Sequence, residues 1–251
     1  MLLTLYSQVL SISKVEFLKE IPDGFVNSYA VLKVPLQVLM KDVSLLCLGS
    51  SGNLSLAFEV GYAIGTELRD LGVNALVFGC LDTLDESDED PLSRVSSSPY
   101  ITVRVLEYLA YGLSSAGVVP VIDGSGSIDL ETVKALKSRG LYLPVYIDEP
   151  FKADILVSMG YDTVFFDGKT FLNSKPPVFK WRGDRKVDFE KLRREVLSRS
   201  IVVMNPNSSG IAVNDPFSNS KVLIFSNEDW LLKLAKEVEA GKKPPTGRKT
   251  W

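Results

Sequence analysis

The chain of 251 residues contains no histidine, only two cysteines, and barely more acidic than basic residues. Because histidine is absent, a hydrolase built on this chain would use carboxylates for proton transfer. A bound metal ion would have oxygen ligands, which favours Mg²⁺, Mn²⁺ or Ca²⁺ over Zn²⁺. Cys47 and Cys80 allow at most one pair, so we expect both to be reduced core residues. A net charge of −3 provides no concentrated basic face, which argues against a nucleic-acid partner.

Two further absences concern the origin and location of the chain. Only Gln8 and Gln37 are glutamines, a scarcity that is typical of thermophilic proteins. Residues 1–17 have neither a basic start nor a small-residue cleavage site, and they are too short to span a bilayer. We therefore expect a cytoplasmic protein without a membrane partner.

Residues 57–123 contain the clearest pattern in the chain, a helix followed by a glycine and a short apolar strand, repeated twice. The first helix has apolar residues on one face, Gly72 ends it, and residues 73–81 form an apolar strand. The second unit has a helix at 103–113, Gly117 and a strand at 118–122. Two such units predict an α/β fold with a parallel, TIM-barrel-like (β/α) sheet. The sequence leaves open whether this barrel closes or is incomplete.

The rest of the chain is expected to continue this barrel as one domain over 1–240, followed by a flexible tail at 241–251. A Gly/Ser turn at 49–52 has the composition of a phosphate cradle but lacks the P-loop lysine, so a plain strand-to-helix turn is favoured. The expected strands are 2–12, 43–48, 143–147, 163–166, 201–204 and 222–225, with a further apolar run at 28–40. The expected helices are 130–139, 151–159, 187–198 and 228–240, the last capped by Asn227.

An aspartate closes four of the apolar runs. Parallel strands of a barrel would gather these side chains at one rim, either as a polar site or as caps of the following helices. The four are Asp82, Asp123, Asp148 and Asp167, and Glu149 follows the third. The acidic loop after Asp82 lacks calcium-loop spacing and is expected to be solvated. Arg94, which ends this loop, has Asp82, Asp88 and Glu89 as candidate partners.

Three segments resemble glycoside hydrolase family 3. EVGYAIGTELRDLGVNALVFGCLD is similar to the family's helix G-x5-ELR-x-x-G-[IV]-N, which leads into a strand ending PVxD. SRVSSSP followed by YGLSSAGVVPV is similar to the next segment, RSF…GLQxAGV, and residues 198–227 resemble the family's boundary between barrel and second domain. The resemblance implies a shortened family 3 barrel related to β-N-acetylhexosaminidases, a carbohydrate ligand, and a substrate-contacting role for Arg94.

The chain also departs from this family's pattern. The family's D-x-E-G-G loop has no counterpart, and the family's Lys-His pair is replaced by a strand ending at Asp123, so both the lysine and the proposed histidine acid/base are missing. Residues 163–167 resemble either the nucleophile strand, which would make Asp167 the nucleophile, or the strand before it, which would leave none.

Three hypotheses follow. The first is a degenerate barrel without glycosidase activity that binds a small polar ligand or a partner, with Asp82, Arg94, Asp148 and Glu149 as ligand contacts. The second is an active retaining glycosidase, with Asp167 as nucleophile and Asp123, Asp148 or Glu149 as acid/base. The third is a metal-dependent enzyme or module built on the same aspartates. We expect no cofactor under the first two hypotheses, and a protein partner or a homo-oligomer stays open.

Overall fold

The computed structural model of the protein describes residues 7–11, 29–85, 90–161, 163–166, 169–172, 185–204, 221–223, 228–245 and 247. Its centre is a seven-stranded sheet in the order β1 to β7. The first six strands are parallel, and β7 is antiparallel to β6. The strands are β1 (Ser7–Ser11), β2 (Tyr29–Lys33), β3 (Ala75–Phe78), β4 (Val119–Asp123), β5 (Val145–Ile147), β6 (Thr163–Phe166) and β7 (Lys169–Leu172). The parallel α/β architecture expected from the sequence is confirmed.

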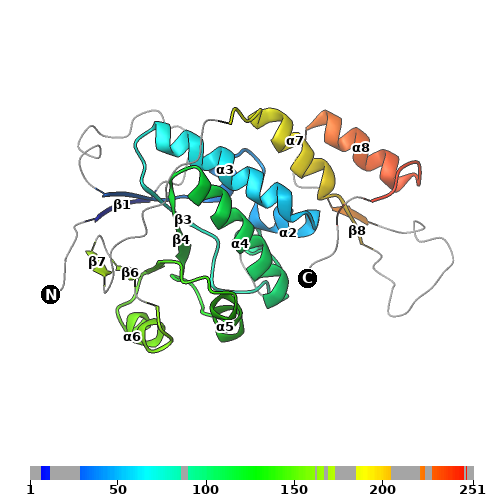
Figure 1. The fold of residues 1–251 in the computed structure, drawn as a ribbon. Coiled ribbons are helices and arrows are strands. Elements are labelled where there is room, and N and C mark those ends of the chain that lie inside the picture. Colours follow the sequence, from blue (N-terminus) through cyan, green and yellow to red (C-terminus); the bar gives the residue numbers. More distant parts are fainter. Residues whose placement is uncertain are drawn as a thin grey trace.

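The helices lie on the outer side of this sheet. Helices α3 and α4 lie side by side next to α2, and α7 and α8 lie farther out (Figure 1). The helices are α1 (Leu36–Leu39), α2 (Leu45–Ser51), α3 (Leu54–Asp70), α4 (Pro99–Ser115), α5 (Leu130–Ser138), α6 (Phe151–Ser158), α7 (Phe189–Arg199) and α8 (Asp229–Glu239), with a 3-10 turn, η3, at Pro91–Ser93. In the part of the chain that the structure describes, no helix has the length and apolar character needed to cross a membrane.

The two faces of the sheet have different surroundings. Leu76 and Ile122 belong to the main hydrophobic core under the helices. Val77 and Val121 point the other way, because successive strand residues face opposite sides, and they form a smaller buried cluster against Tyr146. Edge strands β1 and β7 approach within 8 Å between Cα atoms but do not pair. The sheet therefore curls around its inner face without closing, as an incomplete TIM-like barrel.

Glycine is required where α3 and α4 cross. A Cβ atom on Gly61 would overlap the backbone carbonyl of Leu109, and one on Gly112 would overlap the backbone carbonyl of Phe58. No side-chain rotation could relieve either overlap, because both obstacles are backbone atoms. The crossing fixes the two helices against each other, and with them the strands β3 and β4 that follow.

Residues 43–48 are expected to be a strand. Residues 45–48 instead form the first part of the buried helix α2. The hydroxyl oxygen of Ser44 accepts a hydrogen bond from the backbone N–H of Cys47 at 3.1 Å and caps this helix. All residues of α2 are buried, and an apolar run in a fully buried helix has no periodicity that distinguishes it from a strand. Residues 49–51 belong to the helix and Gly52 ends it, so the expected turn and the phosphate cradle considered there do not form.

Both cysteines are free and buried, as expected. Burial raises the pKa of the Cys47 thiol to about 12, and burial also raises the pKa of the Cys80 thiol. Neither thiol is therefore disposed to ionise near neutral pH, and both serve the core as small apolar groups.

The helices and strands expected between residues 57 and 166 are otherwise confirmed, with small shifts of their ends. The strand β7 was missed, although it follows β6 after Asp167 and Gly168, a pair typical of two-residue hairpins. In the C-terminal region, β8 (Val202–Met204) and β9 (Lys221–Leu223) pair with each other in a separate sheet and do not extend the barrel.

The last helix also begins differently from the prediction. Its N-cap is Glu228, whose side chain makes no capping hydrogen bond, whereas Asn227 lies outside the described residues. The Glu228 carboxylate is instead held by a buried arginine, Arg193 of α7.

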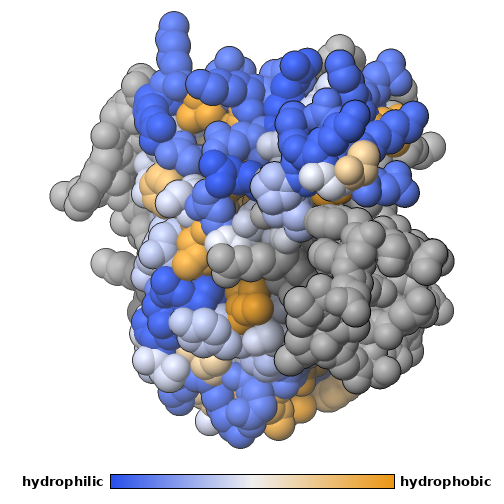
Figure 2. Space-filling model, turned by 90° about the vertical axis from the view of Figure 1, so that its right-hand side faces the viewer, coloured by the Kyte–Doolittle hydropathy of each residue, from blue (hydrophilic) through white to orange (hydrophobic). Residues whose placement is uncertain are grey.

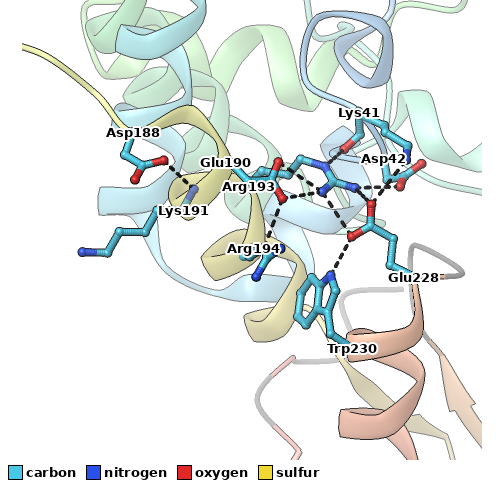
Figure 3. A network of polar contacts seen from close by, with 9 residues as sticks. All are labelled: Lys41, Asp42, Asp188, Glu190, Lys191, Arg193, Arg194, Glu228 and Trp230. Carbon is cyan, nitrogen blue, oxygen red and sulfur yellow. Dashed lines mark hydrogen bonds and ion pairs between the residues drawn. The ribbon is translucent and has the colours of Figure 1, made fainter.

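Arg193 joins α7 and α8 to the turn that precedes α2 (Figure 3). Its side chain is 5% exposed, and its guanidinium donates to Glu228 Oε1 at 2.6 Å and to Asp42 Oδ2 at 3.1 Å. The same group donates to the backbone carbonyl of Lys41 at 2.8 Å. On the face seen in Figure 2, the described part of the surface is largely hydrophilic, with smaller hydrophobic areas between the hydrophilic ones.

The arginine makes stability depend on the ionisation of Glu228. Its hydrogen bond, together with those of the Trp230 indole N–H and the Lys41 ammonium group, lowers the pKa of the Glu228 carboxyl from 4.5 to about 2. A carboxyl group whose pKa is lower in the folded state stabilises the fold at any pH above its unfolded-state pKa. This stabilisation is lost as the pH falls through the folded-state pKa. We expect Glu228→Gln to be less stable than the wild type at pH 7 and the difference to shrink between about pH 4.5 and 2.

Urea denaturation at a series of pH values measures this difference. Glu131→Gln, in which an exposed glutamate of α5 is changed, is the control for the loss of a surface carboxylate. A difference between wild type and Glu228→Gln that stays constant from pH 5 to pH 2 would contradict the role of the ion pair.

Candidate functional site

A pocket opens at the carboxyl ends of β2, β3 and β4. Its volume is ≈ 320 Å³, which lies near the lower end of the range of ~300–1,000 Å³ found for small-molecule sites. Apolar side chains of the segment after β2, of α2 and of β3 form one wall. The polar groups of the lining include Lys33, Asp82, Arg94, Asp123, Ser125 and Ser127. Parallel α/β folds place their ligand sites at this end of the sheet.

Lys33 and Asp123 form the inner part of the site. They are the last residues of β2 and β4, and the ammonium nitrogen of Lys33 lies 3.0 Å from Asp123 Oδ2. Lys33 Nζ donates to the hydroxyl oxygen of Ser125 at 2.8 Å, and this hydroxyl in turn donates to Asp123 Oδ1 at 2.6 Å. The ring of Tyr146 lies beneath the ammonium group, 4.3 Å from Nζ to the ring centre. Three polar groups are thus linked at the mouth of an apolar inner face.

Arg94 and Asp82 form the outer part of the site. Arg94 Nη2 lies 3.4 Å from Asp82 Oδ2, and the two side chains are 17% and 18% exposed. The hydroxyl of Ser127 donates to the same carboxylate oxygen at 2.6 Å, and the backbone N–H of Thr83 donates to Asp82 Oδ1 at 3.0 Å. Of the three partners considered for Arg94, the structure shows Asp82; the other two, at positions 88 and 89, lie outside the described residues.

Asp148 and Glu149, predicted as ligand contacts, lie at the rim but not in the lining of the pocket. They are exposed and pair with Lys152 of α6, at 2.7 Å from Asp148 Oδ1 and 3.6 Å from Glu149 Oε2. Lys152 also donates to the backbone carbonyls of residues 125 and 126. These contacts hold the loop after β4 in place, so the two acids support the site indirectly.

The remaining predicted site residue, Asp167, lies outside the described residues. Strand β6 leads into the antiparallel strand β7, whereas β3, β4 and β5 each lead into a helix. Within the described ranges, no group of three or more His, Cys, Asp or Glu side chains is placed to hold a metal ion. The described aspartates at the strand ends contact cations instead of one another.

Of the cations that pair with these acids, Arg94 was identified from the sequence, whereas Lys33 and Lys152 were not. Lys33 lies in the apolar run at 28–40, but nothing in this run indicates which strand it would pair with. Lys152 follows Asp148 by four residues, the spacing at which helical side chains meet, and this signal was available. None of the described strand-end aspartates caps the helix after it; α5, for example, is capped by Asp129.

No protein-family model and no curated protein matches this sequence. The structure is similar to beta-glucosidase 3B from Thermotoga neapolitana in complex with alpha-D-glucose (20% identity, TM-score 0.39), covering 48% of this chain and 22% of that chain. It is also similar to LpqI from M. tuberculosis (18% identity, TM-score 0.44), covering 57% of this chain and 52% of that chain.

A third similar structure is NagZ from Neisseria gonorrhoeae in complex with zinc ion (15% identity, TM-score 0.44), covering 63% of this chain and 65% of that chain. The chain thus spans less than two thirds of the length of each of the three. They are glycosidases of glycoside hydrolase family 3, the family that the motifs resemble. The likeness concerns the fold of part of each chain.

Proposed function

We propose that the protein binds a small, hydroxyl-rich ligand of the carbohydrate class in this pocket and does not hydrolyse glycosidic bonds. The observation that carries the proposal is the composition of the lining, in which two cation–carboxylate pairs stand beside an apolar wall. A sugar ring needs both donors and acceptors for its hydroxyl groups and an apolar surface for its C–H faces. Arg94 further supports the proposal, since it occupies the position of the substrate-contacting arginine in the motif that the sequence resembles.

The same contacts argue against hydrolysis. A retaining glycosidase needs two carboxyl groups ~5 Å apart, one as nucleophile and one to give and take a proton. Asp82 and Asp123 each contact a cation and a serine hydroxyl and not each other, so they are not arranged as the facing carboxyl pair that this mechanism needs. The histidine proposed as acid/base in the family's hexosaminidase branch is missing from the sequence. The pocket therefore fits a binding protein of carbohydrate metabolism that has lost the family's chemistry.

A thermal-shift screen tests the binding. Glucose, N-acetylglucosamine and muropeptide fragments are compared with divalent metal ions, and a ligand at 100 times its Kd should stabilise the fold by about 2.7 kcal/mol. We expect stabilisation by a sugar, its loss in Arg94→Ala, and its persistence in Arg199→Ala, where the arginine pairs with Glu195 on the surface of α7. Stabilisation by no sugar in the panel would contradict the proposal.

Assays with aryl β-glucosides and aryl β-N-acetylglucosaminides test the absence of hydrolysis. We expect wild type and Asp167→Asn to release the aryl group at the same background rate. A burst of product from the wild type that disappears in Asp167→Asn would instead show an active retaining enzyme.

A further inference from the structure

Lys33 is placed differently from the other lysines of the described residues, because it alone lines the pocket. Its side chain is 26% exposed and leaves the inner face of the sheet at the end of β2. Strand pairing puts Lys33 beside Val77, which belongs to the buried apolar cluster. A primary amine is therefore presented to the pocket from an apolar floor, with a carboxylate and a hydroxyl at its end.

We propose that Lys33 forms a Schiff base with a carbonyl-bearing ligand, such as an open-chain hydroxyaldehyde, and that Asp123 carries the proton. Lysine amines are the side chains that condense with carbonyl compounds, and they require a neighbouring acid–base group. The inference rests on the pocket of the proposed function and adds a covalent step to it. It concerns an amine and a carbonyl carbon, so it is independent of any cleavage of a glycosidic bond.

The proton balance closes within the residues of the site. The Lys33 ammonium first gives a proton to the Asp123 carboxylate, 3.0 Å away, which frees the nitrogen lone pair. The lone pair attacks the carbonyl carbon, a C–N bond forms, and the carbonyl oxygen takes the proton from Asp123. The nitrogen then returns a proton to Asp123, which passes it to the hydroxyl of the carbinolamine. Water leaves and the C=N bond forms, with no change in oxidation state.

Ser125 is a positioning residue for this step. Its hydroxyl accepts from Lys33 Nζ and donates to Asp123 Oδ1, and its backbone N–H donates to the same oxygen at 2.9 Å. These bonds hold the Asp123 carboxylate against the amine, with Oδ2 at 3.0 Å and Oδ1 at 3.2 Å from Lys33 Nζ. The alternative is that Lys33 and Asp123 form a structural ion pair, in which case Lys33 would react with a carbonyl compound no faster than a surface lysine.

Reductive trapping tests the proposal. The full chain is exposed briefly to glycolaldehyde with sodium borohydride, and the modification of each lysine is measured by peptide mass spectrometry. We expect Lys33 to react at least about 100-fold faster than the exposed Lys134, which is the lower end of what a positioned acid–base group contributes. The Lys33 adduct should be absent in Lys33→Arg, fall about 100-fold in Asp123→Asn, and be unaffected in Lys134→Arg.

Ser125→Ala serves as a second variant if Asp123→Asn does not fold, and it should also slow the reaction at Lys33. Modification of Lys33 at the rate of surface lysines, or an unchanged rate in both Asp123→Asn and Ser125→Ala, would overturn the proposal. Methyl glucoside, which has no free carbonyl, separates this proposal from the carbohydrate function. Stabilisation by methyl glucoside without fast trapping at Lys33 refutes only the Schiff base. Fast trapping at Lys33 without stabilisation by any sugar supports the Schiff base and refutes carbohydrate binding.

Discussion

Replacing Gly112 by alanine is expected to lower the free energy of unfolding by about 3 kcal/mol, the upper part of the usual range for overpacked positions. The added Cβ atom would overlap the backbone carbonyl of Phe58 and approach the backbone nitrogen of Tyr62 at 2.6 Å. Helices α3 and α4 would have to separate, and the strands that follow them would move with them. The expected fall in melting temperature is about 6–12 °C for a chain of this size.

The same substitution at Gly126 is the control. There the added methyl group would meet its nearest neighbour, Arg94 Nη2, at 3.8 Å, which is an ordinary contact. Gly112 lies in helix α4, where alanine in place of glycine would stabilise the fold by roughly 0.5–1 kcal/mol if nothing obstructed the added methyl group. A melting temperature of Gly112→Ala equal to or above that of the wild type would therefore contradict the close crossing of α3 and α4.

Arg193→Met is expected to destabilise the fold by about 3 kcal/mol, because three carboxylates lose the buried cation that they share. Methionine preserves much of the side-chain volume and removes the charge. Asp42 and Glu228 would lose their common donor, and Glu190 Oε1 would lose a contact of 3.2 Å. Helix α8 should then separate from α7 more readily, which hydrogen exchange of the α8 amides would detect.

Arg199→Met provides the comparison for this variant. Arg199 is also on α7, but its side chain is 49% exposed and its ion pair with Glu195 lies on the surface, where such pairs contribute at most about 1 kcal/mol. Equal stability of the two variants would show that the buried guanidinium does not hold α8.

The parts of the fold that could be predicted from the sequence are those with a periodic signal. The two units between residues 57 and 123 have amphipathic helices, exit glycines and strands buried on both faces, and all of these are confirmed. Helix α2 could not be predicted because burial on all sides removes its periodicity. The separate pairing of β8 with β9 could not be predicted either, since it depends on contacts between distant segments and not on local pattern.

For the pocket, the sequence indicates several lining residues but not all of their contacts. Asp82, Arg94 and Asp123 line one pocket, because the ends of neighbouring parallel strands meet at one edge of the sheet. The pairing of Asp123 with Lys33 was not predictable, since the two residues are 90 positions apart in the sequence. Buried charges such as Glu107 and Arg193 escaped notice for a similar reason, because sequence pattern places charged residues on the surface.

Calorimetric titration measures carbohydrate binding in the pocket directly. The sugar that stabilises the protein best is titrated into wild type, Arg94→Ala and Arg199→Ala. We expect saturable binding at one site in wild type and in Arg199→Ala, and no measurable heat in Arg94→Ala. Equal affinity in all three proteins would place the ligand elsewhere and contradict carbohydrate binding in this pocket.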